Sequence, residues 1–160
     1  MATNKAPHGG SVIILSIMIA MLLMILPLPD VLRFMRPEWV LMTLIYWTMA
    51  LPQRSGVGLA WVIGLFMDVL TGGALGILAL AYSLVTYLVL QFYLQLRQYP
   101  TWQQALSVLP LVLVVHLIIV IMSSGVNAGW HIWLPAISSM VLWPVIYLLL
   151  RAARRTFHVS

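Results

Sequence analysis

The chain has 160 residues, of which 63% are apolar and 7% are charged, far below the roughly 25% charged content of soluble domains. This composition excludes a soluble domain and indicates an integral membrane protein, and the absence of Cys excludes disulfides, thiolate nucleophiles and Cys-ligated metals. The formal net charge of +5 comes from Lys and Arg at the ends of apolar runs, which favours contact with lipid headgroups over nucleic-acid binding.

Apolar runs separated by short polar segments predict an all-α fold with six transmembrane helices. The length suits one membrane domain, residues 1–160. No small-x-small cleavage site follows the first run, so we expect it to remain as the first span. The predicted helices cover about 11–28, 38–51, 57–71, 75–96, 105–123 and 132–150.

The segment between the first two predicted helices concentrates charge, with Asp30, Arg33 and Arg36 followed by Glu38. Pro37 and Glu38 suit a helix start, because Pro is favoured at the first helical position and an acid complements the positive end of the helix dipole. Trp39 is a residue type that anchors helices at membrane interfaces.

The third predicted helix places Asp68 inside an apolar run. An Asp at the centre of a membrane helix costs roughly 2.5 to 3.5 kcal/mol, so it normally faces protein, a partner charge or water. Gly64, Asp68, Gly72 and Gly76 are each four residues apart, and on a continuous helix at least the first three would share one closely packed side. The Thr-Gly-Gly sequence that begins at Thr71 predicts a break before the fourth helix.

The distribution of Lys and Arg predicts the orientation, because cytoplasmic loops are richer in them. With the N-terminus inside, the inner segments carry six of the eight and the outer segments carry only Arg33 and Arg36. Both termini should then be cytoplasmic, and Asp68 should lie near the outer end of its helix. Two interpretations of Asp68 stay open: it pairs with these Arg residues, or it reaches the interface or a local backbone turn.

The remaining polar residues receive structural interpretations. His116 lies mid-span, and a neutral ring bonded to a backbone carbonyl, such as one freed at Pro110, is preferred over a proton relay or ligand role. In the tail, Arg151, Arg154 and Arg155 can hold the last helix to an anionic inner leaflet. Their spacing alone defines no binding motif.

Catalytic machinery is not indicated by the sequence. The only carboxylate side chains are Asp30, Glu38 and Asp68, and the chain has no HExxH, no GxSxG and no Gly-rich phosphate loop. We therefore expect a protein that is not an enzyme, with no catalytic residue, cofactor or metal. Its function should be carried by helix faces and a few loop residues.

Three stretches resemble the MreD family of rod shape-determining proteins, in the form found in Gram-negative bacteria. They are RPEWVLMTLIYWTMALPQR, with Arg36, Pro37 and Trp39; VGLAWVIGLFMDVLTGGALG, with Gly64, Asp68, Gly72 and Gly76; and the ending VLWPVIYLLLRAARR. The resemblance covers nearly the whole chain. It implies a non-enzymatic subunit of the lateral wall-synthesis machinery in the bacterial inner membrane.

The resemblance also implies partners and a fold. The partners are MreC, the glycosyltransferase RodA with its penicillin-binding transpeptidase, and indirectly the actin-like MreB. The fold would be similar to the substrate-binding subunits of energy-coupling-factor transporters. We expect the Gly and Asp series and the Arg36 segment to support the packed helix surface that receives MreC. The alternative is a small-molecule-binding transporter subunit, although the uncharged outer loops offer little to recognise a polar vitamin.

Overall fold

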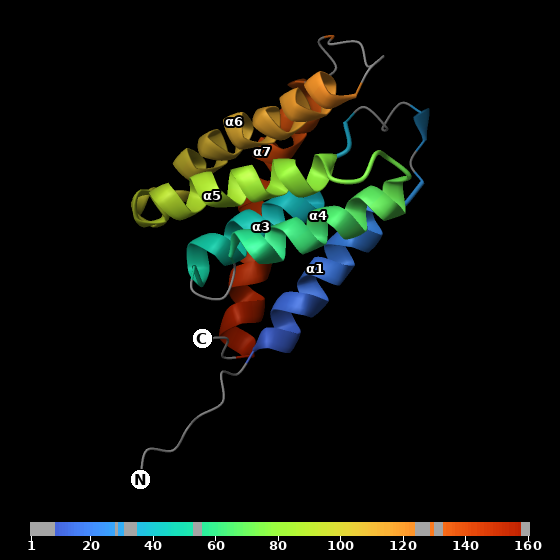
Figure 1. The fold of residues 1–160 in the computed structure, drawn as a ribbon. Helices are drawn as coiled ribbons and strands as arrows, with labels where there is room; N and C mark the ends of the chain where they lie inside the picture. The colour runs from blue at the N-terminus through green and yellow to red at the C-terminus, as the bar shows by residue number, and fades with distance from the viewer. Residues whose placement is uncertain are drawn as a thin grey trace.

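The computed structural model describes residues 9–27, 29–30, 35–52, 56–123, 129 and 133–157. Within these ranges the chain forms six helices, which run up and down an elongated bundle (Figure 1). They are α1 (Gly10–Ile25), α3 (Trp39–Ala50), α4 (Val57–Thr71), α5 (Ile77–Gln98), α6 (Thr101–Met122) and α7 (Trp133–Thr156). The start of α1 and the end of α7 lie at the same end of the bundle. Three residues used to predict the orientation lie outside the described ranges: Lys5, Arg33 and Arg54.

Several helix ends differ from the predicted ones for identifiable reasons. α1 ends at Ile25 rather than near 28, because Pro27 disfavours helical geometry in the residue before it. α6 begins at Thr101, directly after Pro100, rather than near 105. α7 continues to Thr156 rather than ending near 150, since the Ala and Arg residues of the basic tail are good helix formers.

The core is organised around α3, which packs against α1, α5 and α7. Every residue of α3 after Trp39 is buried, including Trp47 and both Thr side chains. A helix that is apolar all round is expected inside a protein rather than at its surface. The hydroxyls of Thr43 and Thr48 donate to backbone carbonyls four residues earlier, at 2.9 Å and 2.7 Å, so their burial leaves no unpaired donor.

α4 packs on α5, and α6 packs on α5 and α7, outside the three helices that cover α3. All of these helices present apolar side chains outward. Among the described helices, α5, α6 and α7 are long and apolar enough to cross a membrane, whereas α1, α3 and α4 are apolar but shorter. Exposed Leu, Ile, Val and Phe side chains line the outer faces of this layer. An all-helical chain with this surface is suited to a lipid environment. Six complete spans remain a prediction.

Candidate functional site

Asp68 lies in the last turn of α4 and is only 2% exposed. Its carboxylate accepts backbone N–H groups at the start of α5, from Gly76 at 2.9 Å, Leu78 at 3.1 Å and Ala79 at 3.4 Å. The first N–H groups of a helix lack partners within the helix and carry partial positive charge. Asp68 therefore caps α5 from the preceding helix, which is the local-turn interpretation of this residue.

Two glycines shape the turn between these helices. Gly72 ends α4 with a φ of +70°, and the next N–H, of Gly73, donates to the Asp68 carbonyl at 3.2 Å. Gly76 precedes α5 with a φ of +99°. Both are left-handed conformations that favour glycine. α4 ends at Thr71, where the sequence predicted the break, so Gly72 lies beyond the helix face that carries Gly64 and Asp68.

Gly64, one turn before Asp68, allows the backbones of α4 and α5 to approach closely. A Cβ at this position would lie 2.6 Å from the Ala79 nitrogen and 2.7 Å from the Leu78 carbonyl oxygen, and closer still to the Ala79 Cα. The backbones of α4 and α5 thus touch at Gly64. The same two residues of α5, Leu78 and Ala79, receive both this contact and the Asp68 carboxylate, so one short segment ties the hairpin together.

Arg36 forms hydrogen bonds with the end of α1 rather than with Asp68. Its guanidinium donates to the backbone carbonyls of Met24 and Leu26. The last carbonyls of a helix have no partner within the helix, so the guanidinium satisfies the end of α1. The proposed pairing of Arg36 with Asp68 is thereby wrong, and Arg33 lies outside the described residues.

Pro37 and Trp39 lie on an apolar groove between α1 and α7. The groove has a volume of about 470 Å³ and is lined by Leu23, Leu26, Met35, Pro37, Trp39, Ile137, Ser138, Val141 and Leu142. α1 packs mainly on α3 and touches α7 only lightly, which leaves room between them. We call this feature the α1–α7 groove.

Glu38, between Pro37 and Trp39, is a functional candidate that the sequence did not single out. It is buried, its backbone N–H donates to Ser139 Oγ on α7 at 2.9 Å, and its Oε1 lies 3.2 Å from His116 Nε2 on α6. This approach of His116 to a carboxylate was not predicted from the sequence. The sequence offered one indication of this contact. Glu38 and His116 are polar residues in apolar surroundings, and each lies within two turns of the helix end on the same side of the predicted bundle.

Glu38 and Asp68 line the same cavity. It has a volume of about 260 Å³, and both carboxylates and Tyr82 are among its lining residues. The Tyr82 hydroxyl is buried and has no hydrogen-bond partner within the described part of the chain. Across those same residues, no group of three or more His, Cys, Asp or Glu is placed to hold a metal ion. The cavity is therefore a mainly apolar pocket into which a few polar side chains reach.

Comparison with known proteins adds to this geometry. The family model for the rod shape-determining protein MreD matches residues 8–153. The rod shape-determining protein MreD of Haemophilus influenzae is 33% identical over 140 residues, which cover 86% of this chain and 86% of that relative. No solved structure matches the chain, so the likeness to energy-coupling-factor subunits stays a prediction. The matched range includes the Asp68 hairpin, the α1–α7 groove and the buried Glu38, and with it the chain belongs to the MreD family of membrane proteins, which determine rod shape.

Proposed function

We propose that the chain is a non-enzymatic scaffold subunit of the rod elongation complex, and that it receives MreC along the α1–α7 groove. The observation that carries this proposal is the groove itself, whose lining is almost entirely apolar. Two of its residues, Pro37 and Trp39, belong to the stretch that carries the resemblance to the family. Through MreC the chain would act with RodA and its penicillin-binding transpeptidase, and indirectly with MreB.

The chemistry of the groove suits a helix of a partner protein. Transmembrane helices associate through close packing and occasional hydrogen bonds, because lipid is as apolar as their side chains. Val141 and Ile137 stand on one side of the groove with 65% and 44% of their surfaces exposed. Ser138 adds one hydroxyl to the same wall. A partner helix would bury this wall and gain a polar contact.

The buried polar residues would give this surface a fixed shape. Glu38 lies between Pro37 and Trp39 in the chain, and it connects α3 to α6 through His116 and to α7 through Ser139. These contacts hold the floor of the groove in register with its α7 wall. Asp68 and Gly64 hold the neighbouring α4–α5 hairpin in the same way. Both sets of predicted site residues would then support the binding surface for MreC. Pro37 and Trp39 line the groove, and Gly64 and Asp68 stabilise the hairpin next to it.

The proposed placement has six spans in the inner membrane of a Gram-negative cell, with both termini in the cytoplasm. The common end of α1 and α7 supports an even number of crossings (Figure 1). The 12 residues of α3 extend about 18 Å, less than the hydrocarbon thickness. Since α3 is enclosed by other helices, its ends need not reach the lipid surface by themselves.

The test is co-purification with MreC after blocking the groove. Val141→Trp should reduce the recovery of MreC by at least about tenfold, because the larger side chain occupies the space of the partner helix. Val69→Trp on α4 is the matched control, since Val69 is 67% exposed and does not line the groove. Equal recovery with both variants, or equal loss, would remove the groove from the account of MreC binding.

A further inference from the structure

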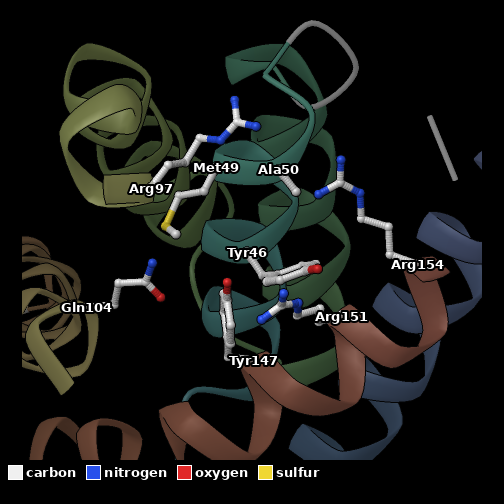
Figure 2. A pocket seen from close by; sticks show the side chains of 8 residues that line it. All are labelled: Tyr46, Met49, Ala50, Arg97, Gln104, Tyr147, Arg151 and Arg154. Carbon is white, nitrogen blue, oxygen red and sulfur yellow. The ribbon is translucent and has the colours of Figure 1, made fainter. Parts of the chain in front are cut away.

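The opposite end of the bundle holds another pocket, which is lined by three arginines. Arg97 comes from the last turns of α5, and Arg151 and Arg154 come from the end of α7 (Figure 2). Tyr46, Tyr147 and Gln104 complete the polar wall of a cavity of about 210 Å³. We call this feature the arginine pocket. Residues of α3, α5, α6 and α7 that are far apart in the sequence meet here.

The charge of this pocket is not balanced by an acidic side chain of the chain itself. The sequence has only three acidic residues, Asp30, Glu38 and Asp68. They follow α1, precede α3 and end α4, and so all three lie at the other end of the bundle. Three positive groups that share one small cavity repel one another, and an anion bound between them would relieve that repulsion.

The wall of the pocket is held in place by other contacts. The Gln104 amide donates to the carbonyls of Leu96 at 2.9 Å and Tyr99 at 3.3 Å, and its oxygen accepts the Trp143 indole N–H at 3.4 Å. The rings of Tyr46 and Tyr147 meet edge to face, with centroids 5.6 Å apart. The pocket is thus formed before any ligand arrives, which lowers the entropic cost of binding.

We propose that the arginine pocket binds the phosphate group of an anionic phospholipid. A guanidinium presents a planar fork of donors that matches phosphate oxygens, and the Tyr hydroxyls add neutral donors. Val145 and Leu148 are more than half exposed and lie on α7 within two turns of Arg151. Acyl chains along these side chains would bring a headgroup to the level of the guanidiniums.

The size of the pocket favours a headgroup over a segment of another protein. Pockets for drug-sized ligands span roughly 300 to 1,000 Å³. A cavity of about 210 Å³ is smaller, so it suits a single phosphodiester group. An α-helix, with a diameter of about 10 to 12 Å, would not enter it.

The experiment is a titration of the purified full chain in detergent with phosphatidylglycerol, followed by native mass spectrometry. Arg97→Gln and Arg154→Gln should each weaken binding about fivefold, and the double variant by more. Arg155→Gln is the control, because it removes the same charge from the same end of α7 at a position outside the pocket lining. Phosphatidylcholine, which has a phosphate but no net charge, should bind much more weakly than phosphatidylglycerol.

The competing outcomes are distinct. Equal weakening by all three single variants would mean that only the total charge matters, and the pocket would be excluded as a site. Displacement of phosphatidylglycerol by inorganic phosphate at equal concentration would assign the site to a soluble phosphate and overturn the lipid source. Tighter binding of a Glu-rich peptide would assign it to an acidic protein segment. None of these results depends on MreC, so the groove proposal is tested separately.

Discussion

The two ends of the bundle treat charge in opposite ways. At one end, Asp68 is satisfied by three backbone N–H groups, and the Glu38 carboxylate has the His116 imidazole beside it. At the other end, three guanidiniums line one cavity, and every acidic side chain of the protein is far away. The first end uses its charges to hold the chain together. The second gathers positive charges that no acidic side chain balances.

The largest effect should follow from removing the Asp68 carboxylate. Asp68→Leu leaves the N–H groups of Gly76, Leu78 and Ala79 without their acceptor in a buried site, which should destabilise the protein by about 3 kcal/mol or more. Thermal unfolding in detergent measures this loss. The control is Asp30→Leu at the same end of the bundle, since Asp30 is exposed. An unchanged melting temperature for Asp68→Leu would show that the cap contributes nothing.

This prediction also separates stability from partner binding. Asp68→Leu should lower the recovery of MreC only as far as it lowers the amount of folded chain, because Asp68 does not line the α1–α7 groove. Val141→Trp should do the reverse and leave unfolding unchanged. A loss of MreC from a fully folded Asp68→Leu protein would place the carboxylate directly at the interface.

The sequence predicted which charged residue needs a protein environment better than it predicted the groups that the charged residues contact. The cost of a charge in an apolar run is a local property, so the need of Asp68 for protein contact was readable from the chain. Its partners depend on the left-handed turn at Gly72 and Gly76, which brings the start of α5 back onto α4. The contact of Glu38 with His116 joins α3 to α6, and no local pattern specifies such a pairing. The arginine pocket was missed for the same reason, because Arg97 and Arg154 line one cavity only through the packing of α5 and of α7 on α3 and α6.

Two glycines of α4, one in the middle of the helix and one in its first turn, should give smaller changes in stability that have opposite signs. Gly64→Ala forces a methyl group into the backbone of Ala79 and should cost about 2 kcal/mol. Gly58→Ala, in the first turn of the same helix, meets no atom within 4 Å and should stabilise the protein by up to about 1 kcal/mol. Paired thermal unfolding curves of the two variants give both signs. Similar shifts in one direction would mean that the α4–α5 contact at Gly64 is loose.

The smallest effect on stability should come from the arginine pocket. Arg151→Gln should change the free energy of unfolding by less than about 0.5 kcal/mol in lipid-free detergent, because Arg151 is exposed. With phosphatidylglycerol present, the wild-type chain should gain thermal stability and the variant should gain less. A large loss for Arg151→Gln without lipid would assign this end a structural role, and the contrast between the two ends would disappear.

The enclosure of α3 has a consequence for how the chain is made. α3 is synthesised second among the six described helices, whereas α5 and α7, which cover two of its sides, follow it. Until α5 and α7 have been made, two sides of α3 therefore lack the helices that cover them in the finished protein. The core closes only after the last helix has entered the membrane. Truncation within α7 should then leave α3 uncovered and send the nascent chain to quality-control proteases.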